Sequence, residues 1–242
     1  MSKVAIVAAM EREVRPLVKK WRVSETEHGG RRFRLFSKDD AVLVCGGIGA
    51  EAARRAAEAV ISVFQPVVVW SAGFAGALDP ALRVGDVLVP RRIINCGDGS
   101  STVLDAGEGV LVSFASIAMP AQKAKLRDSF AAQAVDMEAA AVARAAEARG
   151  IAFAAVKAIS DESDFAFPEM EQFVDSNDQF SERLFTLYAA LRPWLWPRVL
   201  GLARNSSRAA QALCNRLNLM LANATCEDAR ALGAPTEVAE RK

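Results

Sequence analysis

The 242-residue sequence is poor in the side chains that most often build metal and nucleophilic sites, with one histidine and four cysteines. The cysteines are Cys45, Cys96, Cys214 and Cys226, and no two of them form a C-x-x-C pair. This composition argues against a structural zinc site, and against mechanisms that need two functional histidines. The only histidine, His28, lies in a polar stretch that is typical of a turn. Acid–base chemistry is therefore expected from carboxylates.

Long hydrophobic runs are also missing, although 52% of the residues are apolar. No apolar run approaches the roughly 20 residues that span a bilayer. Acidic and basic residues interrupt the first 14 positions, where a signal peptide would need a continuous apolar stretch. We expect a folded cytoplasmic protein with a sizeable core.

The charges nearly balance, with 30 Lys and Arg against 29 Asp and Glu, but they are unevenly distributed. Residues 183–226 contain six arginines and no acidic residue. We therefore expect a catalytic domain over residues 1–190 and a basic helical extension with a tail over residues 191–242.

Short apolar runs alternate with helical patterns, which predicts an α/β protein with a largely parallel or mixed sheet covered on both faces. Strands are expected at Val4–Ala9, Arg32–Phe36, Ala41–Cys45, Val67–Trp70, Val87–Pro90, Val110–Phe114 and Ala152–Ile159. Helices are expected at Glu11–Trp21, Glu51–Phe64, Gln122–Phe130, Met137–Ala148 and Met170–Leu191. Ser71–Gly76 is expected to be a glycine-rich loop after a strand.

Carboxylates follow several of these strands, at the edge of the sheet where α/β proteins bind ligands. Glu13, Glu138 and Asp161 lie at or just beyond strand ends. Each has a structural alternative, since an acidic side chain near a helix start also stabilises the macrodipole or caps the helix. The three together favour a functional site. Neither a phosphate-binding P-loop nor a dinucleotide fingerprint is present.

Five collinear motifs resemble the nucleoside phosphorylase/nucleosidase superfamily, and are most similar to its methylthioadenosine/S-adenosylhomocysteine nucleosidase branch. They are AAMEREV (8–14), GGIGAEAA (46–53), GFAGALDPALRVGDVLVP (73–90), AVDMEAAAVA (134–143) and VKAISDES (156–163). The resemblance implies a three-layer α/β/α sandwich around a central mixed sheet, assembled as a homo-oligomer. It implies cleavage of the N-glycosidic bond of a nucleoside without a metal or an organic cofactor.

The resemblance also implies roles for individual residues. Asp161 matches the acid that protonates or hydrogen-bonds N7 of the purine, so it would have to hold a proton. Glu13 matches the residue that activates the attacking water. Glu138 matches the carboxylate that binds the ribose hydroxyls, and Met137 the thioether that packs against the sugar. Ser160 and Gly47, from neighbouring strand-end loops, complete the substrate contacts expected from the two motifs.

Departures from the family pattern affect the expected substrate. Phe74 replaces a serine near the ribose and Lys157 replaces an arginine, and both are expected to contact the substrate. The middle of the chain is shorter by about 35 residues. Ser113–Ala118 is expected to replace the base-contacting strand, with Ile117 near the position of the stacking aromatic. We expect a more open and apolar pocket that accepts a 5′-substituted adenosine. The shortened hopanoid-associated branch, which acts on a lipid-linked adenosine, is similar in these features.

Two other functions stay open. Phosphorolysis needs cationic donors for phosphate, and the expected phosphate loops contain no arginine, although Lys157, Arg91 or Arg92 could reach an anion. Hydrolysis is therefore preferred to phosphorolysis. A non-catalytic nucleoside-binding module is the remaining alternative, but retention of all three carboxylates argues against it.

The C-terminal extension repeats apolar residues at helical spacing, with arginines on its other faces. The apolar positions are Leu195, Val199, Leu202, Ala209, Leu213, Leu217 and Met220. Three interpretations follow: docking on the body or on a second subunit, peripheral contact with an anionic membrane, and nucleic-acid binding. The first is preferred. Nucleic acid is not expected as a partner, because no groove-reading motif is present.

Overall fold

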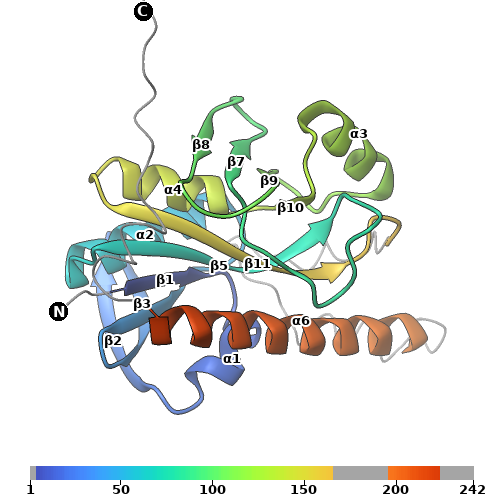
Figure 1. The fold of residues 1–242 in the computed structure, drawn as a ribbon. Helices are drawn as coiled ribbons and strands as arrows, with labels where there is room; N and C mark the ends of the chain where they lie inside the picture. The colour runs from blue at the N-terminus through green and yellow to red at the C-terminus, as the bar shows by residue number, and fades with distance from the viewer. Residues whose placement is uncertain (1–3, 166–195, 224–242) are drawn as a thin grey trace, which may run out of the picture.

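Among the residues that the structure describes, a mixed β-sheet of eleven strands is covered by helices on both faces (Figure 1). The computed structural model describes residues 4–165 and 196–223. The first six strands are β1 (Val4–Ala8), β2 (Arg22–His28), β3 (Arg31–Lys38), β4 (Ala41–Cys45), β5 (Val68–Ala77) and β6 (Val87–Leu88). The others are β7 (Arg92–Asn95), β8 (Ser101–Val103), β9 (Val110–Ser113), β10 (Ala134–Asp136) and β11 (Ala152–Asp161). The expected mixed sheet and three-layer arrangement are confirmed.

Helices pack on the two faces of this sheet (Figure 1). They are α1 (Glu11–Val18), α2 (Ala50–Phe64), α3 (Pro120–Phe130), α4 (Ala139–Glu147) and α6 (Trp196–Asn223). On one face, α2 and α4 form a core with the strands, and their many buried alanines allow close approach. On the other face, α1 and α6 cover Trp70 and Val156. Central strands such as β1 are apolar throughout because both of their faces are buried.

The strand arrangement creates a gap along one edge of β5. β1, β4, β5 and β11 are parallel, and β11 pairs along one edge of β5. On the opposite edge β1 pairs as far as Ser71, and the antiparallel strand β10 pairs at Gly76 and Ala77. The carboxyl ends of β1 and β10 therefore point toward each other across the residues between these two pairings.

Some local predictions were wrong. Ser71–Gly76 is not a loop but lies within β5, because pairing with β11 holds this segment extended. The polar stretch around His28 is the edge strand β2, which faces solvent and so lacks apolar alternation. Residues 114–118 form a loop after β9, not a strand. The helix expected at Met170–Leu191 lies outside the described residues.

The described part of the C-terminal extension is the long helix α6, which packs against the body. Its residues Ala209, Leu213 and Leu217 are buried in the same apolar cluster as Leu17 of α1 and Trp70 of β5. Much of the predicted apolar face is thus covered by the chain itself. Among the helices of residues 4–165 and 196–223, none is both long enough and apolar enough to cross a membrane.

Candidate active site

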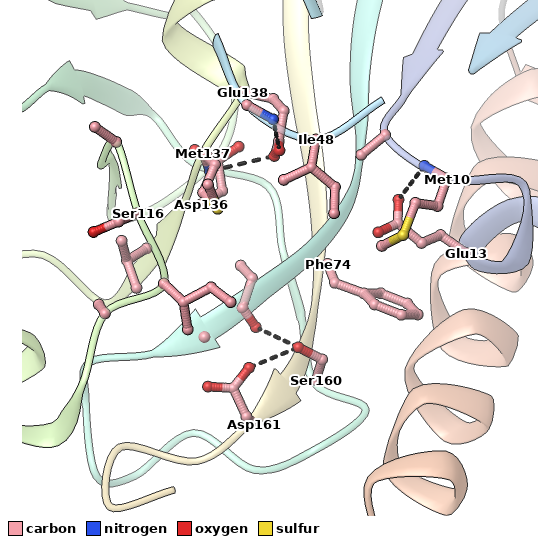
Figure 2. A pocket seen from close by; sticks show the side chains of 18 of the residues that line it. Met10, Glu13, Ile48, Phe74, Ser116, Asp136, Met137, Glu138, Ser160 and Asp161 are labelled. Carbon is pink, nitrogen blue, oxygen red and sulfur yellow. Dashed lines mark hydrogen bonds between the residues drawn. The ribbon is translucent and has the colours of Figure 1, made fainter. Parts of the chain in front are cut away.

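A pocket of about 650 Å³ opens where the carboxyl ends of β1 and β10 face each other (Figure 2). β1 leads into Met10 and Glu13, and β10 leads into Met137 and Glu138. From the other side of β5, the end of β11 contributes Ser160 and Asp161. A register shift between Ile159 and Asp161 interrupts the β5–β11 pairing, and such bulges re-aim side chains. The sheet topology thus brings together three carboxylates from distant parts of the sequence.

Glu13 lies in the first turn of α1 and is buried. Its Oε2 accepts a long hydrogen bond of 3.4 Å from the Met10 N–H. A Cβ on Gly73 would lie 3.0 Å from the same oxygen, so the glycine of β5 leaves room for the carboxylate. Burial, reinforced by the negative charge of Glu138, raises the pKa of Glu13 to about 7. Glu13 can therefore accept a proton near neutral pH.

Glu138 occupies the junction between β10 and α4. Its Oε1 accepts a 2.8 Å hydrogen bond from the N–H of Gly49, and its Oε2 a 3.2 Å bond from the N–H of Met137. Burial and the nearby Asp136 carboxylate raise the pKa of Glu138, while Lys157 opposes this shift. The carboxylate is thereby held in one orientation at the N-terminus of α2, where the helix dipole favours an anion.

A buried ion pair joins strands on either side of the pocket. The Nζ of Lys157 on β11 lies 2.8 Å from Oδ2 of Asp136 on β10, and both side chains are almost fully buried. Asp136 also accepts hydrogen bonds from the Ser113 hydroxyl and the Ala139 N–H. Burial opposes the charged form of Lys157, but the carboxylates of Asp136 and Glu138 outweigh this effect and raise its pKa. The positive charge of Lys157 therefore stabilises the ionised forms of Asp136 and Glu138.

Asp161 is held by donors on both of its carboxylate oxygens. The Ser160 hydroxyl donates to Oδ1 at 2.7 Å (Figure 2). The Lys123 ammonium, from α3, lies 2.5 Å from Oδ2 and also donates to the Glu162 carbonyl at 2.7 Å. A Cβ on Gly76 would lie 2.8 Å from Oδ2, so this glycine of β5 admits the ion pair.

Apolar side chains form much of the remaining wall. Met10, Ile48, Phe74, Ile117 and Leu202 line the pocket, the last of them from α6. Figure 2 shows Phe74 below Glu13, pointing toward α6. The lining combines a few convergent polar groups with a wide apolar wall, which is typical of small-molecule sites.

Seven of the nine residues proposed from the sequence line this pocket. They are Glu13, Phe74, Ile117, Met137, Glu138, Ser160 and Asp161. Gly47 lies next to the lining residue Ile48 and donates its N–H to the Ala9 carbonyl, and Lys157 lies outside the lining, paired with Asp136. Neither is among the residues that line the pocket.

Several lining residues were missed. Lys123 and Leu202 lie outside the five family motifs, and Arg12 lies inside one of them but was given no role in the pocket. A lysine within a helical pattern normally predicts a solvated side chain. The apolar residue Leu126, three positions after Lys123, was the one available sequence signal of an inward helix face. Arg91 and Arg92, considered as anion ligands, instead bond to the Asp105 carbonyl and the Ser101 hydroxyl. Across the described ranges, no group of three or more His, Cys, Asp or Glu side chains is arranged to hold a metal ion.

The sequence profile of the phosphorylase superfamily matches residues 3–118 and 107–191. The chain belongs to the phosphorylase superfamily. The resemblance inferred from the five motifs is thus confirmed at the level of the superfamily. Superfamily members with similar sequences include the 5′-methylthioadenosine/S-adenosylhomocysteine nucleosidase of Bacillus cereus, which is 29% identical over 72% of this chain and 92% of the relative. The Staphylococcus aureus protein of the same name is 29% identical over 75% and 98%, respectively.

Several solved structures share the fold of this chain. Futalosine hydrolase of Helicobacter pylori aligns with a TM-score of 0.70 and 19% identity, covering 92% of this chain and 98% of that one. The Neisseria meningitidis 5′-methylthioadenosine/S-adenosylhomocysteine nucleosidase, in complex with methylthio-immucillin-A, also aligns with a TM-score of 0.70 and 19% identity. In that alignment 93% of this chain and all of the other are covered. At this identity the likeness establishes the fold alone.

Proposed function

We propose that this pocket hydrolyses the N-glycosidic bond of a purine nucleoside and releases the free base. The observation that carries the proposal is the convergence of Glu13, Glu138 and Asp161 on one cavity. Membership of the superfamily and the nucleosidases among its relatives support the same reaction class.

Each carboxylate has a distinct role in the proposed reaction. The bond between the anomeric carbon and the purine breaks through an oxocarbenium-like state, and its electron pair moves to the base. A proton reaches N7 at Asp161, so the base leaves neutral. Glu138 binds the ribose hydroxyls and stabilises the positive charge on the sugar. Glu13 takes a proton from water as its oxygen bonds to the anomeric carbon, and a base with a pKa of about 7 suits this step.

Water is the proposed nucleophile because a backbone N–H of the glycine-rich loop 46–49, which could bind a phosphate, already donates a hydrogen bond within the protein. The N–H of Gly49, at the start of α2, donates to Glu138. A phosphate would have to compete with that carboxylate for the helix N-terminus. Phosphorolysis stays as a second candidate, because the guanidinium-bearing Arg12 lines the pocket beside Glu13 and could attract an anion.

The apolar wall favours an adenosine that carries an apolar 5′ substituent. Phe74 replaces the serine that the family resemblance places near the ribose. Leu202 extends the apolar surface onto α6. An adenosine joined to a hopanoid-type lipid is the largest substrate of this class that we propose. Such a substrate would bring the enzyme to a membrane surface, with residues 191–221 of the basic extension as the proposed contact. On α6, Leu200 is 58% exposed and Arg204 and Arg208 lie nearby in the sequence.

The test of the reaction is a product assay. Purified protein is incubated with adenosine and 5′-alkylthioadenosines of increasing chain length, with and without phosphate, and the base and sugar are separated by chromatography. We expect adenine and the free sugar, which is ribose from adenosine and 5-alkylthioribose from the others, with rates that rise with chain length and do not depend on phosphate. The corresponding sugar 1-phosphate would favour phosphorolysis, and binding without any product would favour a nucleoside-binding module. Cosedimentation with anionic vesicles and light scattering test the proposed membrane contact and homo-oligomer.

A further inference from the structure

The buried lysine beside Asp161 has no place in the roles described so far. Lys123 lies on α3, and its side chain is only 3% exposed. Its ammonium contacts Oδ2 of Asp161 and the carbonyl of Glu162, and the residue lines the pocket. An ammonium is costly to bury unless it is paired. Lys123 is paired with Asp161, the residue proposed to contact the purine, so its burial there calls for a functional explanation.

The hydrogen bonds around Asp161 are those of an ionised carboxylate. An ionised carboxylate accepts hydrogen bonds and donates none. Ser160 faces Oδ1 and Lys123 faces Oδ2, so each oxygen already has a donor beside it. The expectation that Asp161 itself stores the proton for N7 does not fit this arrangement. The proton has to come from a neighbour, and Lys123 is the neighbour that carries one.

We propose that Lys123 is the source of the proton that the purine receives, with Asp161 as the relay between them. The inference rests on the proposed nucleosidase reaction. As the glycosidic bond breaks, its electron pair makes the purine a stronger base. One proton moves from Nζ of Lys123 to the Asp161 carboxylate, while N7 takes a proton from that carboxylate. Asp161 is unchanged at the end, and Lys123 is left as a neutral amine.

This arrangement suits a leaving group that becomes basic only in the transition state. The Lys123 ammonium lies against Oδ2 of Asp161, as in an ion pair, so the proton rests on the lysine. The proton moves only when the departing base competes for it, which protects the proton from loss to solvent. After the products leave, Glu13 releases to solvent the proton that it took from water, and Lys123 regains one proton from solvent.

Two substitutions separate proton supply from charge and packing. Lys123→Met removes the proton and keeps the length of the side chain, whereas Lys123→Arg keeps the charge but provides a much weaker acid. Lys125→Met, two residues along on the exposed face of the same helix, is the matched control. The kcat/KM for a 5′-alkylthioadenosine is measured from pH 5 to pH 8, and nucleoside binding and thermal unfolding are measured for each variant.

At pH 7.5 both K123M and K123R are expected to lose about 10²-fold or more in kcat/KM, the usual contribution of a general acid. The ratio of K123M to wild-type activity should rise as the pH falls, because Asp161 can then take its proton from solution. K125M should match the wild type. A K123R variant within about threefold of the wild type would overturn the proton supply, as would a pH-independent loss in K123M. A wild-type protein that cleaves no nucleoside would instead refute the proposed function itself.

Discussion

The ammonium of Lys157 lies 2.8 Å from the carboxylate of Asp136, and the pair joins β11 to β10 out of reach of solvent. Family resemblance predicts that Lys157 contacts substrate, and in the structure its ammonium is paired with Asp136 and lies outside the pocket lining. Its charge also lowers the pKa of Glu13 and that of Glu138 against the effect of burial. The electrostatics of the pocket therefore depend on a residue that does not line it.

Removing one member of this pair should destabilise the fold. Lys157→Met leaves Asp136 buried without its cation, and we expect a loss of about 3–5 kcal/mol in the free energy of unfolding. The double variant K157M/D136N should recover most of that loss, because an asparagine can still accept the Ala139 N–H hydrogen bond. Chemical denaturation checks both. A K157M variant within about 1 kcal/mol of the wild type would contradict the pairing.

The ionisation of Glu13 should make both the free energy of unfolding and the activity depend on pH. Its pKa is about 7 in the folded protein against an ordinary 4.5. Between these values the folded protein binds a proton that the unfolded chain has released, so its stability falls as the pH rises and levels off above about 7. The contribution is about 3 kcal/mol and is absent from Glu13→Gln.

Denaturation of the wild type and E13Q across pH 4.5–8 measures this difference directly. E13Q should gain stability relative to the wild type as the pH rises. The wild-type kcat/KM should fall below pH 7, since Glu13 has to be ionised to accept a proton from water. Parallel stability curves for the two proteins would refute the shifted pKa.

Substitution of a glycine in β5 should reduce activity without reducing stability. A Cβ at Gly76 would lie 2.8 Å from Asp161 Oδ2 and 3.3 Å from Lys123 Cε, so Gly76→Ala should displace the pair. We expect kcat/KM to fall by about 10–100-fold with little change in thermal stability. Gly46→Ala is the contrasting variant, because its Cβ would meet the Ala52 carbonyl at 2.8 Å and overpack the core. Unimpaired activity in G76A would show that the pair tolerates displacement.

The α6 wall of the pocket should set the preference for long 5′ substituents. Leu202→Gln should weaken the binding of a long-chain 5′-alkylthioadenosine by about 1 kcal/mol, which is roughly fivefold, and leave adenosine unaffected. Leu200→Gln, on the same helix but 58% exposed, is the control and should change neither substrate. The KM values for the two substrates in both variants provide the measurement. Equal effects of L202Q on both substrates would argue against an apolar 5′ subsite.

Much of the sheet could be predicted because its central strands are continuous apolar runs. The expected strands at Val4–Ala9 and Ala41–Cys45 agree with β1 and β4 to within one residue. The edge strand β2 was missed because its polar side chains face solvent, and the second half of β5 because glycine usually marks a turn. Tertiary pairing overrode the local signal in both cases.

The three carboxylates could be placed in one site because strand ends gather at one edge of such a sheet. Lys123 could not, since 38 residues separate it from Asp161 and no pattern links α3 to the end of β11. Nor could the sequence show that Lys157 is satisfied by Asp136, which depends on the register of β5 with both β10 and β11.

The most direct test of the proposed chemistry is the turnover of Asp161→Asn compared with its nucleoside affinity. Asparagine keeps the shape of the side chain but cannot relay a proton to N7. Base release is followed by chromatography, and binding by calorimetry with the same 5′-alkylthioadenosine. We predict a dissociation constant within a fewfold of the wild type and a turnover reduced by about 10²–10⁴-fold. Turnover at the wild-type rate in D161N would contradict catalysis by this pocket.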